Sequence, residues 1–136
     1  WSKEERAANA ETAVKQALED VGLAHTIDMM PSELSGGMRK RIALARTLIL
    51  KPKIILYDEP TTGLDPITAR EISDLMNSIQ AKYNTAAIII SHDMNCIKMT
   101  GNRIIMLIEG KNYAEDQFEN LLKNTDPKVR DFFEGL

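Results

Sequence analysis

Two adjacent carboxylates, Asp58 and Glu59, directly follow the short apolar run Ile54–Tyr57. Such a run is typical of a strand buried on both faces in a parallel sheet. Ligands bind at the carboxyl ends of the strands in open α/β sheets. Carboxylates at that edge can hold a magnesium ion and orient an attacking water, as phosphoryl transfer requires. Taken alone, an Asp–Glu pair in this position is more often a solvated strand end.

A second candidate site is the segment Leu34-Ser35-Gly36-Gly37-Met38, which stands where a helix is expected to begin. Free backbone N–H groups and the positive end of the helix dipole favour an anion there. The glycines let the main chain approach an oxygen-rich ligand, and the Ser35 hydroxyl adds a donor. A phosphate would fit this segment. The alternative is that Ser35 only caps the helix and the glycines belong to a loop.

Two further polar segments follow predicted strands. The stretch Pro60-Thr61-Thr62-Gly63-Leu64-Asp65-Pro66 comes directly after Glu59, and Ser91-His92-Asp93 comes after the apolar run Ala86–Ile90. Asp65 and Pro66 have the residue types of a helix N-cap and first helical position. A lone histidine such as His92 is more often a core or loop residue than a functional one.

The hydrophobic pattern predicts an α/β fold in which these segments lie at the ends of elements. Apolar residues at helical spacing predict helices at 10–21, 38–50 and after Pro66. The second helix is expected to place Met38, Ile42, Ala45 and Ile49 on one face. Strands are expected at 54–57, 86–90 and 103–108, the first two joined as a β-α-β unit, with short helices at 116–123 and 127–134.

Composition limits the class of protein. The 136 residues suit one domain, with 43% hydrophobic and 27% charged residues and a net charge of -3. The chain has no excess of basic residues, so its charge gives no indication of nucleic-acid binding. The longest apolar runs are far shorter than the roughly 18 residues that cross a bilayer. Cys96 is the only cysteine in the sequence, which excludes an internal disulfide.

The order of the motifs resembles the C-terminal half of the ATP-binding subunit of ABC transporters. An L-S-G-G segment and a helix precede a strand with D-E-P-T-T-G-L-D-P, and a further strand precedes S-H-D. The fold that this resemblance implies is a partial P-loop NTPase fold, a parallel sheet with flanking helices. The implied cofactors are ATP and Mg²⁺.

The resemblance also implies a role for each matching residue. Leu34, Ser35, Gly36, Gly37 and Met38 match the signature motif, which contacts the γ-phosphate of ATP held by the opposite subunit. Asp58 resembles the Walker B aspartate that coordinates magnesium through water, and Glu59 the catalytic glutamate. The segment from Thr62 to Asp65 resembles the D-loop that crosses the dimer interface. His92 resembles the switch histidine that senses the γ-phosphate.

Two features narrow the resemblance to the ATPases of Mla-type systems, which move phospholipid or confer organic-solvent tolerance. Met38 occupies a position where the family often has Gln, and the stretch 126–135 is similar to the end of these subunits. The alternative for that stretch is an amphipathic helix with Val129, Phe132 and Phe133 on its apolar side.

The sequence contains no G-x-x-x-x-G-K-S/T segment, which a P-loop requires. We therefore expect residues 1–50 to be a remnant of a helical subdomain with the signature motif, and 51–136 to be part of the catalytic core. Such a chain should not hydrolyse ATP unaided. In the resembled fold the P-loop strand lies between the strands at 86–90 and 103–108. Exposed strand edges seek partners, so we predict that the chain self-associates, exchanges elements or rearranges.

The implied partners are a second ATPase subunit and transmembrane permease subunits, and no nucleic acid is expected. The implied location is the cytoplasm, peripheral on the inner face of the cell membrane. A soluble ABC-type ATPase of DNA repair, translation or cofactor assembly is the alternative. A non-catalytic module derived from such an ATPase is a third possibility, against which Glu59 and His92 weigh.

Overall fold

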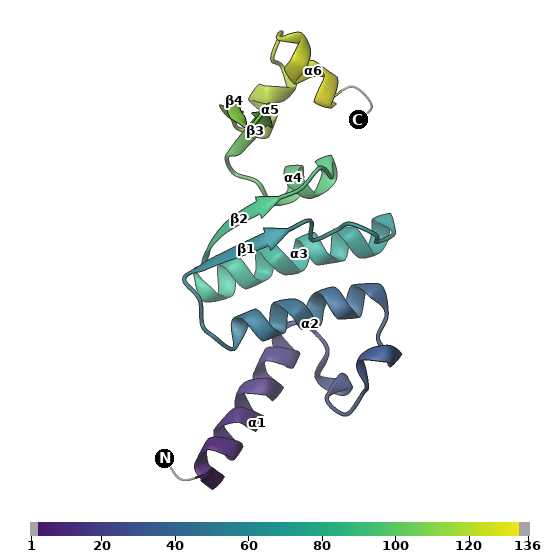
Figure 1. The fold of residues 1–136 in the computed structure, drawn as a ribbon, viewed down its shortest axis with the longest axis vertical. Coiled ribbons are helices and arrows are strands. Elements are labelled where there is room, and N and C mark those ends of the chain that lie inside the picture. Colours follow the sequence, from purple (N-terminus) through teal and green to yellow (C-terminus); the bar gives the residue numbers. More distant parts are fainter. Residues whose placement is uncertain (1–2, 134–136) are drawn as a thin grey trace.

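The computed structural model describes residues 3–133 and arranges them in an elongated series of layers (Figure 1). Helices α1 and α2 lie toward one end, and α3 with two strands occupies the middle. A β-hairpin with two short helices forms the other end. The helices are α1 (Lys3–Asp20), α2 (Gly36–Leu48), α3 (Pro66–Tyr83), α4 (Met94–Thr100), α5 (Phe118–Leu122) and α6 (Pro127–Phe133). The strands are β1 (Ile54–Asp58), β2 (Ala86–Ile90), β3 (Ile104–Ile108) and β4 (Lys111–Asp116).

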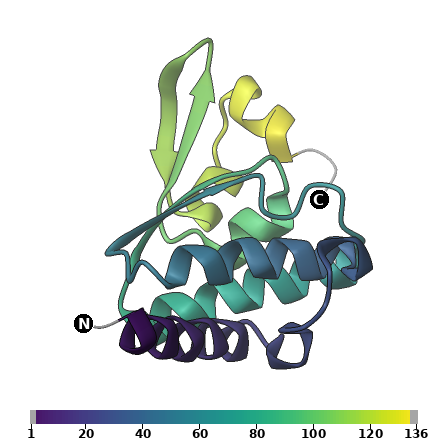
Figure 2. The ribbon, with the colours of Figure 1, turned by 60° about the horizontal axis from the view of Figure 1, so that its bottom comes forward.

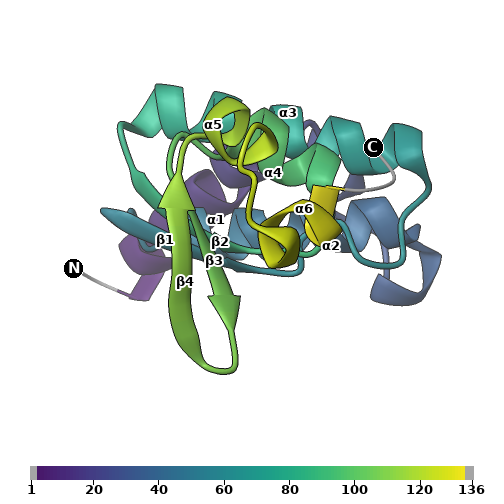
Figure 3. The same ribbon diagram turned by 90° about the horizontal axis from the view of Figure 1, so that it is seen from above.

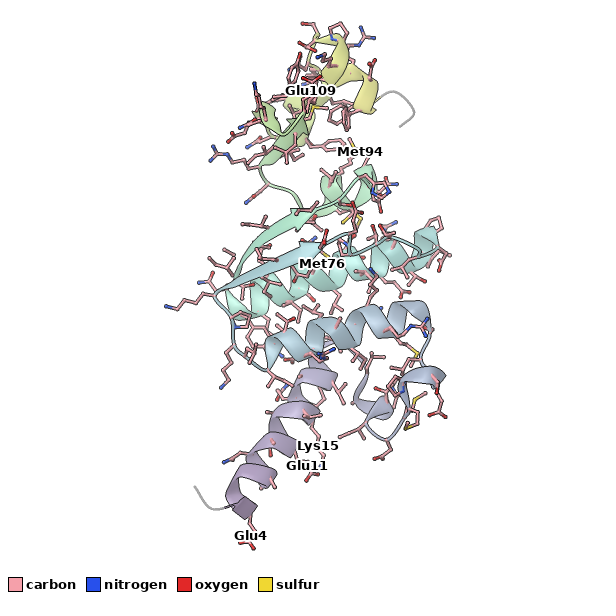
Figure 4. All side chains as sticks on the ribbon, viewed as in Figure 1. Glu4, Glu11, Lys15, Met76, Met94 and Glu109 are labelled. Atoms are coloured by element: carbon pink, nitrogen blue, oxygen red, sulfur yellow. The ribbon has the colours of Figure 1, made fainter. Side chains whose placement is uncertain are left out.

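The predicted β-α-β unit is confirmed as β1-α3-β2. The two strands are parallel, in a register that pairs Ile54 with Ala86 and Asp58 with Ile90. Helix α3 begins as expected, because the Asp65 carboxylate accepts from the backbone of the first turn and Pro66 occupies its first position. The buried side of α3 includes Met76, which lies where the helix faces β1 (Figure 4).

The apolar sequences of β1 and β2 predicted strands buried on both faces, but the structure buries only one face. Ile55 is 3% exposed, whereas Leu56 beside it is 74% exposed. Along β2, Ile88 and Ile90 are also exposed on the side that the register pairs with Leu56 and Asp58. Only one face of this sheet is covered by helices within the described residues, so the strands leave an apolar face open.

Helices α1, α2 and α3 lie side by side beneath the sheet (Figure 2). Helix α1 ends at a glycine, as expected: Gly22 has φ +71°, and the backbone N–H of Leu23 donates to Leu18 O at 2.8 Å. The expected face of α2 is confirmed at Ala45, which is buried, and at Met38 and Ile42, which pack against the same core, whereas Ile49 is 41% exposed. Helix α2 runs from Gly36 to Leu48, two residues earlier than predicted at each end, so Ile49 lies just beyond its last residue.

The strand predicted at 103–108 does not extend the parallel sheet. It forms an antiparallel hairpin with β4, a strand that the sequence did not reveal, and this hairpin projects beyond the helices (Figure 3). Met106 packs with Leu121 of α5 and Val129 of α6 in a second small core. Helix α4 was also missed, and it packs on α3. Within residues 3–133, no strand lies between β2 and β3.

None of the helices in the described part of the chain is long and apolar enough to cross a membrane.

Candidate functional site

The backbone of Glu59 forms a tight turn directly after β1. Its φ is +46°, a left-handed conformation that non-glycine residues seldom adopt. The Glu59 N–H donates to the carbonyl of Ile90 at 2.9 Å, which ties the turn to the end of β2. The Lys40 ammonium of α2 donates to the Glu59 carbonyl at 3.0 Å. Both polar groups of the Glu59 main chain therefore have partners on other elements.

The Glu59 carboxylate lies beside His92. The His92 Nδ1 atom is 2.9 Å from this carboxylate, and the Thr62 hydroxyl donates to it at 2.9 Å. The hydrogen bond with His92 holds the pKa of Glu59 below its ordinary value. The same bond raises the pKa of His92. Glu59 is therefore ionised at neutral pH, and its carboxylate can accept a proton or a water hydrogen bond.

A second acidic contact supports the loop that carries His92. The Thr61 hydroxyl donates to Asp93 Oδ2 at 2.8 Å. The other oxygen of Asp93 accepts from the backbone N–H groups of Asn95 and Cys96 and so caps α4. This contact joins the segment after Glu59 to the segment after His92.

Asp58 lies at the last position of β1 and is exposed. Among residues 3–133, no group of three or more carboxylate, histidine or cysteine side chains could hold a metal ion by itself. A single exposed carboxylate still suits Mg²⁺, which is commonly bound by one or two carboxylates together with substrate phosphates and water. The position of Asp58 fits that requirement.

The segment Leu34–Met38 forms the entry to α2. The Ser35 hydroxyl accepts from the Met38 N–H at 3.2 Å, so Ser35 is the N-cap of the helix. The Arg39 guanidinium donates to the Leu34 carbonyl at 2.8 Å. The cap role, which was the alternative interpretation, is thus present. It leaves the hydroxyl hydrogen of Ser35 and the first N–H groups of α2 able to donate to an anion.

The start of α2 packs against the start of α3. A Cβ atom added at Gly37 would lie 2.6 Å from the Thr68 Cγ2 atom, and one at Gly36 would lie 3.6 Å from Leu64. Gly37 is therefore required by close packing within this chain. Asp65 accepts from the N–H groups of Ile67 and Thr68 and from the Thr68 hydroxyl. The structure thus gives Asp65 a capping role.

The structure brings together Glu59, His92 and Thr62 and leaves Leu34–Met38 at a separate place, beside the start of α3. Sequence reasoning missed Lys40 and the Thr61–Asp93 contact. No local pattern signals either contact, because Lys40 and Glu59 are 19 positions apart and Thr61 and Asp93 are 32 positions apart.

Solved structures share the fold of this chain. A solved ATP-binding cassette of an ABC transporter matches with a TM-score of 0.81 and 31% identity, over 99% of this chain and 53% of the solved chain. A bacterial ABC transporter cassette, solved as a dimer, matches with a TM-score of 0.69 and 32% identity over 86% of this chain and 49% of its own. The fold is thus a partial P-loop NTPase fold, an α/β architecture with a parallel sheet and flanking helices.

The sequence comparisons name the family. Residues 2–62 match the ABC transporter family. The intermembrane phospholipid transport system ATP-binding protein MlaF of Escherichia coli (strain K12) is 37% identical over 125 residues, which make up 92% of this chain and 46% of MlaF. The chain therefore belongs to the ABC transporter ATP-binding family and is similar to its Mla-type members. It spans about half the length of the relatives that it matches.

Proposed function

We propose that this chain forms part of the ATP-hydrolysing subunit of an ABC transporter and that Glu59 is its catalytic acid–base residue. The observation that carries the proposal is the Glu59 carboxylate, held 2.9 Å from His92 at the carboxyl end of β1. This is the sheet edge at which α/β proteins bind their ligands. In this role Glu59 orients a water molecule and accepts its proton, while His92 senses the phosphate.

The other site residues have roles that suit their positions. Bound Mg²⁺ would supply charge neutralisation and a Lewis acid for the transferred phosphoryl group. Asp58 would hold it through water, because its carboxylate is exposed at the end of β1. The Ser35 hydroxyl and the N–H groups of Gly36 and Gly37 would bind a γ-phosphate presented by a second subunit. Asp65, together with the loop from Thr62, would lie at the interface between the subunits.

The organisation of the chain follows from this proposal. Residues 1–50 would belong to the helical subdomain and carry the signature motif, and residues 51–136 would belong to the catalytic core. The dimeric cassette among the similar structures supports a second ATPase subunit as partner. Because the sequence contains no P-loop motif, we propose that these 136 residues do not hydrolyse ATP unless a P-loop is supplied.

The transported substrate that we propose is a lipid. The support is the similarity to MlaF, whose name assigns it to intermembrane phospholipid transport. Transmembrane permease subunits would then be the membrane partners, and the chain would lie peripherally on the cytoplasmic face of the membrane. The exchange of lipid between vesicles containing the permease, measured with and without ATP, tests this assignment.

The catalytic role is tested by Glu59→Gln in a cassette that joins this chain to a P-loop segment. Gln keeps the shape of the side chain but removes the base, so phosphate release should fall to less than about a tenth of the original rate. Nucleotide binding should persist. Glu119→Gln is the matched control, because Glu119 is exposed in the first turn of α5. Hydrolysis retained in the Glu59→Gln variant would overturn the proposed role.

A further inference from the structure

The turn that carries Glu59 depends on contacts from other elements. A glutamate with φ +46° is in a sparsely populated backbone region, which persists only where the surrounding structure holds it. One such contact fixes the amide side, since the Glu59 N–H donates to Ile90 O of β2. The Thr62 hydroxyl and His92 hold the carboxylate. The Glu59 carbonyl accepts from the Thr62 N–H at 3.3 Å within the turn, and a second, shorter bond reaches it from another element.

The Glu59 carbonyl is an unusual acceptor because the next residue is Pro60. The peptide unit between them has no N–H, so the carbonyl is its only hydrogen-bonding group. Pro60 itself is buried. The carbonyl accepts from two donors, the Thr62 N–H within the turn at 3.3 Å and the Lys40 ammonium at 3.0 Å. Lys40 is the donor that ties this carbonyl to another element.

Lys40 reaches this carbonyl from the helix that begins at the signature segment. It is partly buried and lines a cavity of about 220 Å³ between α2, β1 and α3, together with Leu44, Tyr57 and Asp58. Its basic neighbours point to other partners: Arg39 donates to Leu34, and Arg41 donates to the carbonyl of Val21 and to Glu71. Within the part of the chain that the structure describes, Lys40 is the one of these three consecutive cations that donates to the turn carrying Glu59.

We propose that Lys40 is a positioning residue, whose ammonium holds the Glu59 carbonyl and so keeps the Glu59 backbone in the conformation that directs its carboxylate toward His92. Because the peptide unit is planar, fixing the carbonyl also fixes the direction in which the chain leaves Glu59. The structural part of this proposal, that Lys40 fixes the Glu59 backbone, concerns this chain alone and does not depend on ATP hydrolysis. Its consequence for turnover rests on the proposed function.

The structural part is tested by NMR on the 136-residue chain. The three-bond coupling between HN and Hα of Glu59 depends on φ, and the Glu59 carbonyl carbon shift reports its hydrogen bond. In Lys40→Met, which keeps most of the side-chain length but has no donor, both observables should shift, together with the His92 ring signals. In Lys40→Arg, which restores a donor, they should stay near the original values.

Arg46→Met is the matched control, because Arg46 is an exposed cation in the last turn of the same helix. It should leave the Glu59 and His92 signals unchanged. Unchanged Glu59 signals in a folded Lys40→Met chain would overturn the proposal. If Lys40→Met does not fold, Lys40→Arg decides: Glu59 signals that move away from the original values in that folded variant would also overturn it.

The consequence for turnover is tested in a cassette that joins this chain to a P-loop segment. Misplacement of a catalytic group by about 1 Å can cost on the order of a hundredfold in rate. We therefore expect Lys40→Met to lower kcat for ATP roughly ten- to a hundredfold, with KM little changed and with recovery in Lys40→Arg. An unchanged kcat would overturn this part. If Glu59→Gln also leaves kcat unchanged, the proposed function has failed instead, and the NMR result still decides the structural part.

Discussion

At the level of single residues, the bond between Glu59 and His92 makes the local stability depend on pH. The pKa of His92 is raised above its ordinary value of 6.5. Its contribution to stability is therefore full below pH 6.5 and is lost as the pH rises through the raised pKa. The pKa of Glu59 is lowered from 4.5. Its contribution to stability is therefore present above pH 4.5 and is lost as the pH falls through the lowered pKa. The charged pair is therefore best formed between about pH 4.5 and 6.5.

This dependence can be measured from the His92 ring signals in an NMR titration. In the unmodified chain the midpoint should lie above 6.5, because the Glu59 carboxylate favours the imidazolium. Glu59→Gln removes the charge, and the midpoint should then fall. The same midpoint in both proteins would show that the two side chains are not paired in solution.

His92 itself is suited to a functional role because its side chain is 78% exposed. An exposed side chain adds little packing, so His92→Ala should change the melting temperature of the chain by less than about 3 °C. In a cassette with a P-loop, the same substitution should lower ATP turnover at least about tenfold. Calorimetry and phosphate release measure the two effects. A variant that mainly unfolds would instead make His92 a structural residue.

At the level of elements, the contact between the starts of α2 and α3 explains why Gly37 has no side chain. A Cβ atom at this position would overlap the Thr68 methyl group, at 2.6 Å. Gly37→Ala should therefore destabilise the chain by about 1–3 kcal/mol, as overpacking commonly does. Denaturant titration measures this change.

The double variant Gly37→Ala with Thr68→Ser provides the control. Serine lacks the obstructing methyl group but keeps a hydroxyl that can donate to Asp65, as Thr68 does. Most of the lost stability should return. Equal destabilisation of the single and double variants would mean that the contact with Thr68 is not the cause.

The sequence predicted those elements whose signals are local. The N-cap Asp65, the first-position Pro66 and the C-terminal Gly22 marked helix ends that the structure confirms. Helix α4 was missed because its seven residues are too few for a clear apolar period. Strand β4 was missed because its sequence, Lys111–Asp116, is largely polar and its residues are mostly exposed. The Lys40 and Thr61 contacts depend on tertiary packing, which no local pattern encodes.

At the level of the whole molecule, the open sheet face is the main consequence of the way the strands are arranged. Leu56 and Ile88 are paired in register and are 74% and 59% exposed. Their apolar sequences predicted burial on both faces, and a local pattern cannot say which covering element is present. Within residues 3–133, the edge of β2 that faces away from β1 has no partner strand. This edge and the exposed face together form an apolar surface of the kind that favours association.

We therefore expect the 136-residue chain to self-associate, with a sedimentation coefficient that rises with protein concentration. Ile88→Lys places a charge on the open face and should shift the chain toward the monomer. Ile67→Lys is the control, because Ile67 is 75% exposed but lies on α3. A monomer at all concentrations in the unmodified chain would contradict this prediction.

The most direct test of the account is the position of the nucleotide in a crystal structure. A Glu59→Gln cassette that joins this chain to a P-loop segment would be crystallised with ATP and Mg²⁺. We expect the γ-phosphate to lie beside residue 59, Asp58 and His92 of one subunit and against Ser35 and Gly37 of the other. A nucleotide bound away from both groups of residues would contradict the account.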